Sequence, residues 1–332
     1  MAYSLLPVLP PLNWTSGSNF KGCLQRLYSM SSAGQLLKSR ILTPKTSMIG
    51  AYIELTKPKQ TFLLVLTSVF TYIGFGGSSL IDLMKLLAAM ISAVSGATAV
   101  NMALDSEIDS IMDRTRMRPI PRGAVSEFEA TVFGILLILL GLMFSASINL
   151  WVASSTMLGV VFDLLVYTLW AKKRTSLSIV YGSIAGGAPS LAGYAAARGL
   201  LDLASLLVVV ITAAWIPAHI WYISIYYMED YRKAKIPMLP VVAGIKKTAR
   251  IITASIAVMS IAEVLLYVVG GFTPIYLTIA LTPTLLLLYK AAIYARNPSV
   301  KGARRMYKLA SPVEGLVFVA MLADRLLAGV FL

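Results

Sequence analysis

The sequence has few charged residues, which occupy only 13% of its 332 positions, whereas hydrophobic residues occupy 58%. A soluble domain typically has about 25% charged residues, so this composition argues against a water-soluble fold. The chain also has a single cysteine, Cys23, and a single histidine, His219. One cysteine excludes an intramolecular disulfide, and no paired Cys and His spacing indicates a zinc or iron–sulfur site.

Apolar stretches of membrane-spanning length recur along the chain. A crossing needs about 20 mostly apolar residues. Some stretches are too long for one crossing, and we divide them at Asn149, Gly270 with Gly271, and Pro274. The sequence therefore predicts an all-α polytopic membrane protein with nine transmembrane helices. The predicted ranges are 62 to 80, 83 to 104, 130 to 148, 150 to 170, 176 to 197, 203 to 227, 250 to 269, 273 to 293 and 313 to 332.

The 29 Lys and Arg residues segregate to one side of these predicted helices. When residues at helix ends are counted with the nearest loop, the connections after the even-numbered ranges hold 4, 3, 6 and 6 of them. The connections after the odd-numbered ranges hold 1, 0, 1 and 0. This is the positive-inside pattern, which predicts a cytoplasmic N-terminus and an external C-terminus. Because the bases segregate to one membrane side, we attribute the net charge of +14 to contact with the lipid bilayer, and we expect no nucleic-acid partner.

Residues 1 to 53 contain Lys and Arg but no Asp or Glu, and they are rich in serine. We interpret them as a basic, flexible cytoplasmic extension of a protein in the cell membrane. The same bias is found in organelle transit peptides, which would place the protein in the mitochondrial inner membrane. The nine-helix domain is expected to span residues 54 to 332.

The second predicted helix ends in a regular row of metal-binding side chains. Asn101, Asp105 and Asp109 recur every fourth residue, so they lie on one helical stripe. Two carboxylates one turn apart repel each other at a membrane boundary unless a cation lies between them. Mg²⁺ is the natural cation, because it takes oxygen ligands and is usually held by one or two carboxylates together with substrate phosphates.

A loop rich in arginine and proline follows this row. Arg114 and Arg118 have the charge and the fork geometry to bind phosphate oxygens. The alternative interpretation is a helix end solvated by lipid headgroups, with arginines that orient the protein and pair with carboxylates. We assign Arg116 and Arg122 to that structural role.

The sixth predicted helix ends in a second cluster with the same order of acid, base and proline. Asp230 is its candidate metal ligand, Arg232 and Lys233 are candidate substrate-binding residues, and Glu229 is expected only to cap or pair locally. Both clusters end even-numbered helices, so they face the same side and could grip a diphosphate through Mg²⁺. A third basic connection, residues 172 to 174, either binds substrate anions or anchors the topology.

Five ordered motifs resemble those of the UbiA superfamily of intramembrane prenyltransferases, and most closely its heme O synthase branch, the protoheme IX farnesyltransferases. The resemblance runs from about Leu55 to the C-terminus. The motifs are LTKPK at 55 to 59, NMALDSEIDSIMDRTRMRP at 101 to 119, VYTLWAKKRT at 166 to 175, PAHIW at 217 to 221 and DYRKAKIPMLPVV at 230 to 242.

The resemblance implies a bundle of nine helices around a central cavity, with catalytic roles for Asn101, Asp105, Asp109 and Asp230. It also implies that the three aspartates bind the metal. The resemblance also implies substrate-binding roles for Arg114, Arg118, Lys173, Arg174 and His219. From its motifs we add two aromatic residues as substrate-binding candidates, Tyr167 and Trp221.

The chain departs from the family at two positions. Ala234 stands where many UbiA members have a second aspartate, which fits the heme O branch. Lys235 stands where that branch usually has glycine, a departure that bears on the shape of the heme site.

The activity implied is transfer of the farnesyl group of farnesyl diphosphate to a vinyl group of heme B, with addition of water. Mg²⁺ is the implied cofactor, and heme A synthase or terminal oxidase assembly proteins are candidate partners. Two alternatives remain: prenylation of an aromatic quinone precursor or a lipid alcohol, and a non-catalytic heme transporter or oxidase-assembly protein.

Overall fold

The computed structural model of the protein describes residues 47 to 331, with side chains up to residue 327. Within these residues every regular element is a helix. The elements are α3 (Met48–Leu55), α4 (Pro58–Gly74), α5 (Leu80–Leu104), α6 (Ser106–Ile111), α7 (Glu127–Ala146), α8 (Leu150–Val161), the π-helix η1 (Phe162–Ala171), α9 (Ser178–Arg198), α10 (Leu203–Tyr226), α11 (Met228–Lys233), α12 (Leu239–Gly270), α13 (Pro274–Arg296), α14 (Val300–Ala310) and α15 (Val313–Phe331).

The predicted domain boundary between residues 53 and 54 falls inside α3. This short helix begins after Ser47, whose hydroxyl accepts a hydrogen bond from the Gly50 N–H at 3.1 Å. Ala51 and Leu55 on its inner face are buried against α5. The prediction of a basic extension mainly concerns residues 1 to 46, which lie outside the described residues.

Each predicted range overlaps one long helix, but some of the ends differ. The first helix was expected over 62 to 80, and α4 instead begins at Pro58 and ends at Gly74. Proline suits the first helical turn, where its missing N–H is not needed. The seventh was expected to start at 250, and α12 starts at Leu239 with a kink at Gly244, whose φ of 77° is open to glycine at little cost.

Seven helical segments in the described part of the chain are long and apolar enough to cross a membrane. The protein is therefore a multi-pass membrane protein. Of the long helices, α4 and α9 fall outside these seven: α4 has only 17 residues, and α9 is rich in glycine, alanine and serine. The number of nine crossings stays a prediction.

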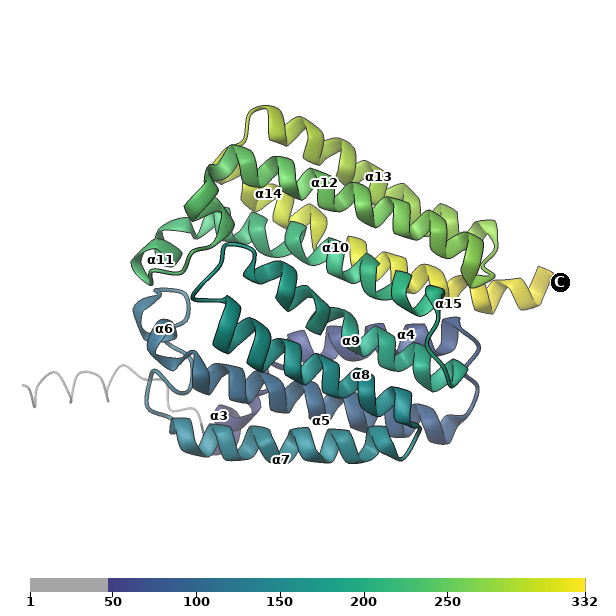
Figure 1. The fold of residues 1–332 in the computed structure, drawn as a ribbon, viewed down its shortest axis with the longest axis horizontal. Coiled ribbons are helices and arrows are strands. Elements are labelled where there is room, and N and C mark those ends of the chain that lie inside the picture. Colours follow the sequence, from purple (N-terminus) through teal and green to yellow (C-terminus); the bar gives the residue numbers. More distant parts are fainter. Residues whose placement is uncertain (1–46, 332) are drawn as a thin grey trace, which may run out of the picture. The chain divides into compact units, whose positions relative to one another are not determined.

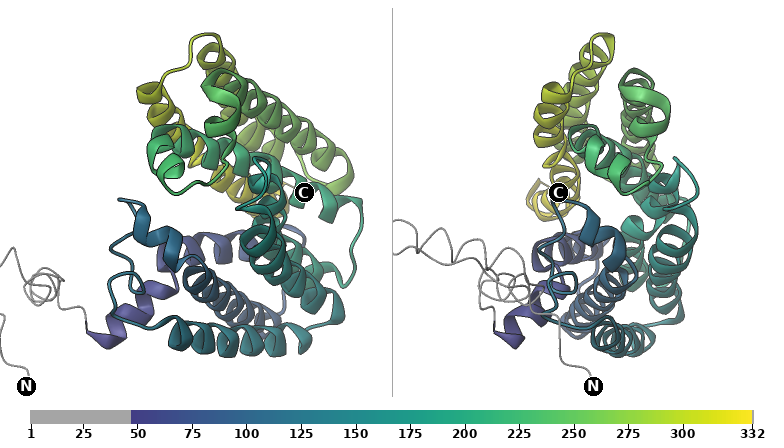
Figure 2. Two further views of the ribbon diagram at one scale, coloured as in Figure 1. Left: turned by 60° about the vertical axis from the view of Figure 1, so that its left-hand side comes forward. Right: turned by 90° about the vertical axis from the view of Figure 1, so that its left-hand side faces the viewer.

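The helices gather into two groups that share one long interface. In Figures 1 and 2 the purple-to-teal helices α4 to α9 lie in one group, and the green-to-yellow helices α10 to α15 lie in the other. Packing of α9 on α10 and of α4 on α15 joins the groups. The short helices α6 and α11 lie at the same end of the bundle (Figure 1), which is the end that the two polar motifs occupy.

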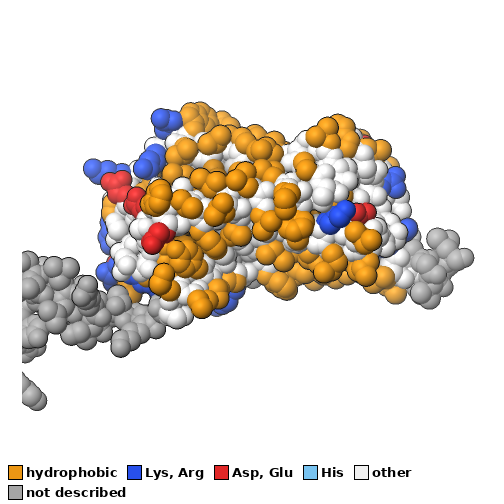
Figure 3. Space-filling view, turned by 90° about the horizontal axis from the view of Figure 1, so that it is seen from below, with side chains coloured by type: hydrophobic (Ala, Val, Ile, Leu, Met, Phe, Trp, Pro, Cys, Tyr) orange, Lys and Arg blue, Asp and Glu red, His pale blue; other side chains and the backbone are white. Residues whose placement is uncertain are grey.

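The outer surface has the composition expected of a lipid-facing protein. The face drawn in Figure 3 is covered by hydrophobic side chains across its middle, while most of its charged side chains lie towards the end occupied by α6 and α11 in Figure 1. Large hydrophobic residues such as Phe128, Leu136 and Val268 are more than half exposed. Such exposure is tolerated where lipid tails replace water.

Helices α4 and α9 approach closely because Gly193 has no side chain. A Cβ atom at Gly193 would lie only 2.1 Å from the backbone oxygen of Ser68. We expect Gly193→Ala to force the two helices apart and to destabilise the fold by about 1–3 kcal/mol, the usual cost of overpacking. The measurement is the midpoint of thermal unfolding of the detergent-solubilised protein.

Gly315→Ala is the matched control for this prediction. A Cβ atom at Gly315 would meet nothing within 4 Å, so the midpoint should stay unchanged or rise slightly, since alanine favours helix. Equal midpoints for the two variants would contradict the close approach of α4 and α9.

Candidate active site

The first acidic motif lies where α5 passes into α6. The helix is interrupted at Asp105, but the Asp105 N–H still donates to the Asn101 carbonyl at 3.0 Å, and the Asp109 N–H donates to the Asp105 carbonyl at 2.8 Å. The three side chains therefore keep the predicted stripe. Asn101, Asp105 and Asp109 are only 8%, 4% and 3% exposed. Buried carboxylates are costly unless they are paired, so their partners define the site.

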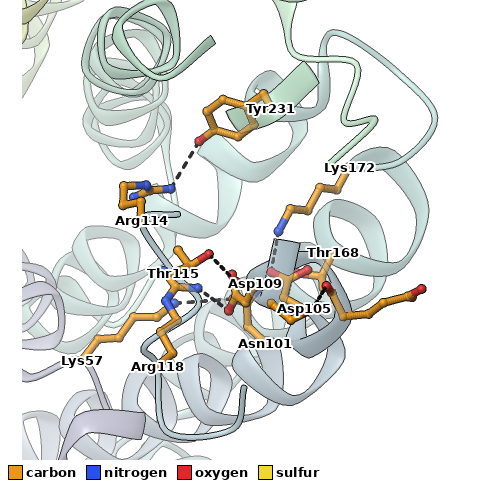
Figure 4. A network of polar contacts seen from close by, with 12 residues as sticks. Lys57, Asn101, Asp105, Asp109, Arg114, Thr115, Arg118, Thr168, Lys172 and Tyr231 are labelled. Atoms are coloured by element: carbon orange, nitrogen blue, oxygen red, sulfur yellow. Dashed lines mark hydrogen bonds and ion pairs between the residues drawn. The ribbon is translucent and has the colours of Figure 1, made fainter. Parts of the chain in front are cut away.

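Each buried carboxylate contacts one base (Figure 4). The Lys172 ammonium donates to Asp105, and the Arg118 Nη1 donates to Asp109 Oδ2 at 2.6 Å. The Thr115 hydroxyl donates to the Asp109 backbone carbonyl at 3.0 Å and holds the loop that carries Arg118. These bases come from different connections, so the folded chain assembles the charge pairs from separate segments.

Asn101 is held by a base and a hydroxyl from two other segments. Its Oδ1 lies 3.5 Å from the Lys57 Nζ, and its Nδ2 donates to the Thr168 hydroxyl at 2.6 Å. Lys57 has a φ of 43°, a left-handed conformation that non-glycine residues rarely adopt outside functional or strained sites. Desolvation, followed by the nearby Arg118 guanidinium, lowers the pKa of Lys57 to about 8.

A π-helix brings Lys172 and Thr168 to the site. Over Phe162–Ala171 the backbone hydrogen bonds join residues that are five positions apart, one more than in an α-helix. The Lys172 N–H continues this pattern by donating to the Tyr167 carbonyl at 2.8 Å. The wider turn is rare and often marks functional sites. The Lys172 Nζ also lies 5.9 Å from the centre of the Tyr167 ring, which places that predicted residue beside the Asp105 pair.

The second acidic motif forms the short helix α11. Asp230 is 9% exposed, and its carboxylate has no partner among the described residues. Arg232 pairs with Glu229 on the exposed side, so Glu229 has the local pairing role that the sequence allowed. Lys233 Nζ lies 3.4 Å from Asp113 in the loop after α6.

Two contacts connect the segments that carry the acidic motifs. The Arg114 Nη2 donates to the Tyr231 hydroxyl at 3.5 Å (Figure 4), and Lys233 contacts Asp113. The motifs therefore lie at one end of the bundle and face each other through basic and tyrosine side chains. A central cavity between them stays a prediction.

The oxygen donors of the first motif suit a hard divalent cation. Among residues 47 to 327, no three His, Cys, Asp or Glu side chains gather closely enough to hold a metal without other ligands. Mg²⁺ does not require such a cage, since it commonly uses one or two carboxylates with water and substrate phosphates. Asp105, Asp109 and the Asn101 oxygen fit that pattern, while Asp230 as a third carboxylate ligand stays a prediction.

The other predicted residues occupy two different settings. Lys173 and Arg174 are exposed and make no side-chain contact within the described chain, whereas Lys172 makes the contact with Asp105. Trp221 is buried at 1% exposure. His219 stacks on Trp215 with ring centres 4.5 Å apart, and its Nδ1 lies 3.3 Å from the Ser311 hydroxyl.

Sequence reasoning missed Lys57, Thr168 and Tyr231 as members of this polar network, and it did not single out Lys172 within the basic connection 172 to 174. Lys57 and Lys59 flank Pro58, and Lys172 is one of three adjacent bases, so the sequence could not tell which of these bases enters the network. The contacts of Arg116 with Asp113 and of Arg122 with Glu54 agree with the structural role predicted for those arginines.

Two acids inside other helices, Asp324 and Glu263, have structural partners away from the motifs. Asp324 accepts hydrogen bonds from the Thr273 and Tyr276 N–H groups at 3.0 Å and so caps the start of α13. Glu263 Oε1 accepts from the Thr284 hydroxyl at 2.8 Å.

Comparison with known proteins gives consistent results for sequence and fold. Residues 61 to 312 match the UbiA prenyltransferase family. A curated relative from Korarchaeum cryptofilum, named protoheme IX farnesyltransferase, is 55% identical over 81% of this chain and 92% of its own length. A relative with the same name from Archaeoglobus fulgidus is 41% identical over 86% of this chain and 99% of its own length.

Two solved structures share the helical arrangement. A structure concerning digeranylgeranylglyceryl phosphate synthase has a TM-score of 0.72 and 20% identity, and it covers 84% of this chain and 99% of its own. A UbiA homolog from Archaeoglobus fulgidus bound to GPP and Mg²⁺ has a TM-score of 0.58 and 17% identity, with coverage of 82% and 99%. The match over most of the chain and the identity to the curated relatives show that this chain belongs to the UbiA prenyltransferase family.

Proposed function

We propose that the protein transfers the farnesyl group of farnesyl diphosphate to a vinyl group of heme B, with addition of water, to give heme O and diphosphate. The observation that carries this proposal is the joint of α5 and α6, where two buried carboxylates and two bases lie together opposite the second acidic motif. The name of the curated relatives, which are up to 55% identical, supports heme B as the acceptor.

The polar network is suited to a substrate that carries several negative charges. Lys57, Lys172 and Arg118 converge on the stripe from three connections, whereas Arg114 contacts Tyr231 on the side of α11 and no residue of the stripe. When bound, Mg²⁺ would neutralise charge that develops on the departing diphosphate, and Asp105 and Asp109 would hold it, with Asp230 as a third ligand. The Asn101 amide is fixed by Thr168, so it can orient the same group.

The bond changes balance with one water molecule. The C1–O bond of farnesyl diphosphate breaks, C1 joins the terminal vinyl carbon, and the adjacent carbon takes the hydroxyl of water while one proton is released. Aromatic faces can stabilise an allylic cation and exclude random water. Tyr167 beside Lys172 and the buried Trp221 are the side chains to which we assign this task.

The remaining predicted substrate contacts fall on the exposed bases and on the histidine. Lys173, Arg174, Arg232 and Lys233 lie on two basic connections and would attract anionic substrates from the aqueous side. His219 lies deeper in α10, where it could approach heme iron or a propionate.

One alternative function has a different prenyl acceptor, and the other has no catalytic activity. Prenylation of a quinone precursor or lipid alcohol would use the same diphosphate site, but the shared name of the relatives favours heme. A non-catalytic heme carrier would have no need of the buried acid–base pairs. From the positive-inside pattern we further propose a cytoplasmic N-terminus and an external C-terminus. Because heme O would be the product, we propose heme A synthase or oxidase assembly proteins as partners. If residues 1 to 53 are a transit peptide, the membrane is the mitochondrial inner membrane.

The acceptor and the metal can be tested together with the purified protein. Incubation with farnesyl diphosphate, Mg²⁺ and heme B should yield heme O, identified by mass spectrometry of the extracted heme. Chelation with EDTA should abolish product, and added Mg²⁺ should restore it, because the diphosphate needs a divalent cation to leave. Prenylation of an aromatic acid without any heme O would overturn the proposal.

Replacement of the stripe carboxylates should remove turnover without unfolding the protein. For Asp105→Asn and Asp109→Asn we expect the rate of heme O formation to fall by roughly 100-fold or more, the scale of losing an electrostatic catalytic group. Glu107→Gln is the control, since Glu107 lies exposed on the same short helix and should keep the original rate. Unchanged product formation in both aspartate variants would argue for a non-catalytic role.

Lys172 should act on the prenyl donor. We expect Lys172→Ala to raise the KM for farnesyl diphosphate by about tenfold, the effect of losing one charge-assisted contact, while the KM for heme B stays nearly constant. Lys59→Ala is the control. Lys59 is an exposed base in the first turn of α4, and its side chain makes no hydrogen bond or ion pair among the described residues. An equal effect of the two variants would point to general surface charge.

A further inference from the structure

Helix α10 ends in a pair of tyrosines, and each of their rings carries an arginine from a different element. The rings of Tyr226 and Tyr227 meet edge to face, with centres 4.8 Å apart. The Arg304 Cζ from α14 lies 5.1 Å from the centre of the Tyr226 ring, and its Nη1 donates to the Tyr226 hydroxyl at 3.3 Å. The Arg114 Cζ lies 5.5 Å from the centre of the Tyr227 ring. The tyrosine pair therefore orients two guanidinium groups.

Neither of these two arginines has a carboxylate partner within residues 47 to 327. By contrast, four other arginines of the two acidic motifs and their loops do contact Asp or Glu. They are Arg116, Arg118, Arg122 and Arg232. The stretch from residue 297 to 312 that contains Arg304 has no acid at all. The positive-inside pattern explains a basic loop here, but it does not explain why two of the bases are fixed on neighbouring rings.

This arrangement suits a different anion from the one at the acidic stripe. Around Asp105 and Asp109 the bases are balanced by carboxylates, so an anion binds there together with a cation. The Tyr226–Tyr227 pair presents two uncompensated guanidinium forks, which bind carboxylates directly and in two-point geometry. Two such forks on one tyrosine pair match a ligand with two carboxylates.

Aromatic rings continue from Arg304 along the contact of α10 and α14. Tyr307, on the same helix as Arg304, lies tilted over His219 with ring centres 4.7 Å apart. His219 stacks on Trp215, whose Nε1 donates to the Ala310 carbonyl at 2.7 Å. Flat apolar rings next to two carboxylate-binding groups suit a flat apolar ligand with acidic side chains on one edge.

We propose that Arg304 and Arg114, held by Tyr226 and Tyr227, bind the two propionates of the porphyrin acceptor. This proposal rests on the proposed function, because it assumes that heme B is the acceptor. Arg304 and Tyr226 then determine which acceptor is bound, separately from the residues that bind the prenyl diphosphate.

The first test compares two adjacent arginines in the full-length protein in uncharged detergent. We expect Arg304→Ala to weaken heme B binding by about tenfold or more and to raise the KM for heme B, with the KM for farnesyl diphosphate unchanged. Arg305→Ala is the matched control, because Arg305 is also exposed and its side chain makes no hydrogen bond, ion pair or ring contact among the described residues. Arg304→Lys should recover part of the affinity, and Tyr226→Phe should show a smaller loss.

The second test removes the charge from the ligand instead of the protein. Iron protoporphyrin IX dimethyl ester, whose propionates are esterified, should bind the original protein more weakly than heme B. Arg304→Ala should then cause no further loss. An equal loss for heme B and for the ester would overturn the proposal, because the arginine would act through structure. A loss that appears only in vesicles containing anionic phospholipid would assign Arg304 to lipid headgroups and would also overturn it.

Failure of this inference can be told apart from failure of the proposed function. If the original protein forms heme O but Arg304→Ala behaves like Arg305→Ala, only the propionate site is wrong. If the original protein neither binds heme B nor forms heme O, the acceptor itself is wrong and the inference falls with it.

Discussion

The structure of the site depends on the compensation of two buried carboxylates by two bases. Asp105 and Asp109 would be strongly destabilising if left alone, and Lys172 and Arg118 remove that cost by bringing two distant connections to the end of α5. In the proposed reaction a metal ion would replace the bases as the partner of the carboxylates, and phosphate oxygens would replace the carboxylates as the partners of the bases. The charges therefore stay balanced while the substrate enters.

Much of the fold follows from local features of the sequence. Apolar runs predicted the ranges of the long helices, and the fourfold spacing of Asn101, Asp105 and Asp109 predicted a stripe that the backbone hydrogen bonds preserve across a helix break. The choice of Lys172 over its two neighbours could not be predicted, because it depends on a π-helix whose wider turn has no clear sequence signal. The position of Lys57 depends on contacts formed only in three dimensions.

Each of the two proposed anion sites takes residues from both groups of helices. The first group contributes the acidic stripe and its bases. The second group contributes α10, α14 and their aromatic rings, with tyrosines that hold Arg304 and Arg114 without an acid. A common donor site with a variable acceptor site is one way in which a single fold can serve different acceptors.

The π-helix has a consequence for what this membrane segment faces. Each residue of an α-helix turns the chain by about 100°, so one extra residue in a turn rotates everything that follows by that amount. In the stretch from Phe162 to Ala171 this rotation allows one helix to face lipid before the wide turn and the site after it. The lipid-facing side of α8 can keep its apolar pattern while the residues after the wide turn point a base inward. The π-helix thus allows one membrane segment to present an apolar face to lipid and a base to the site.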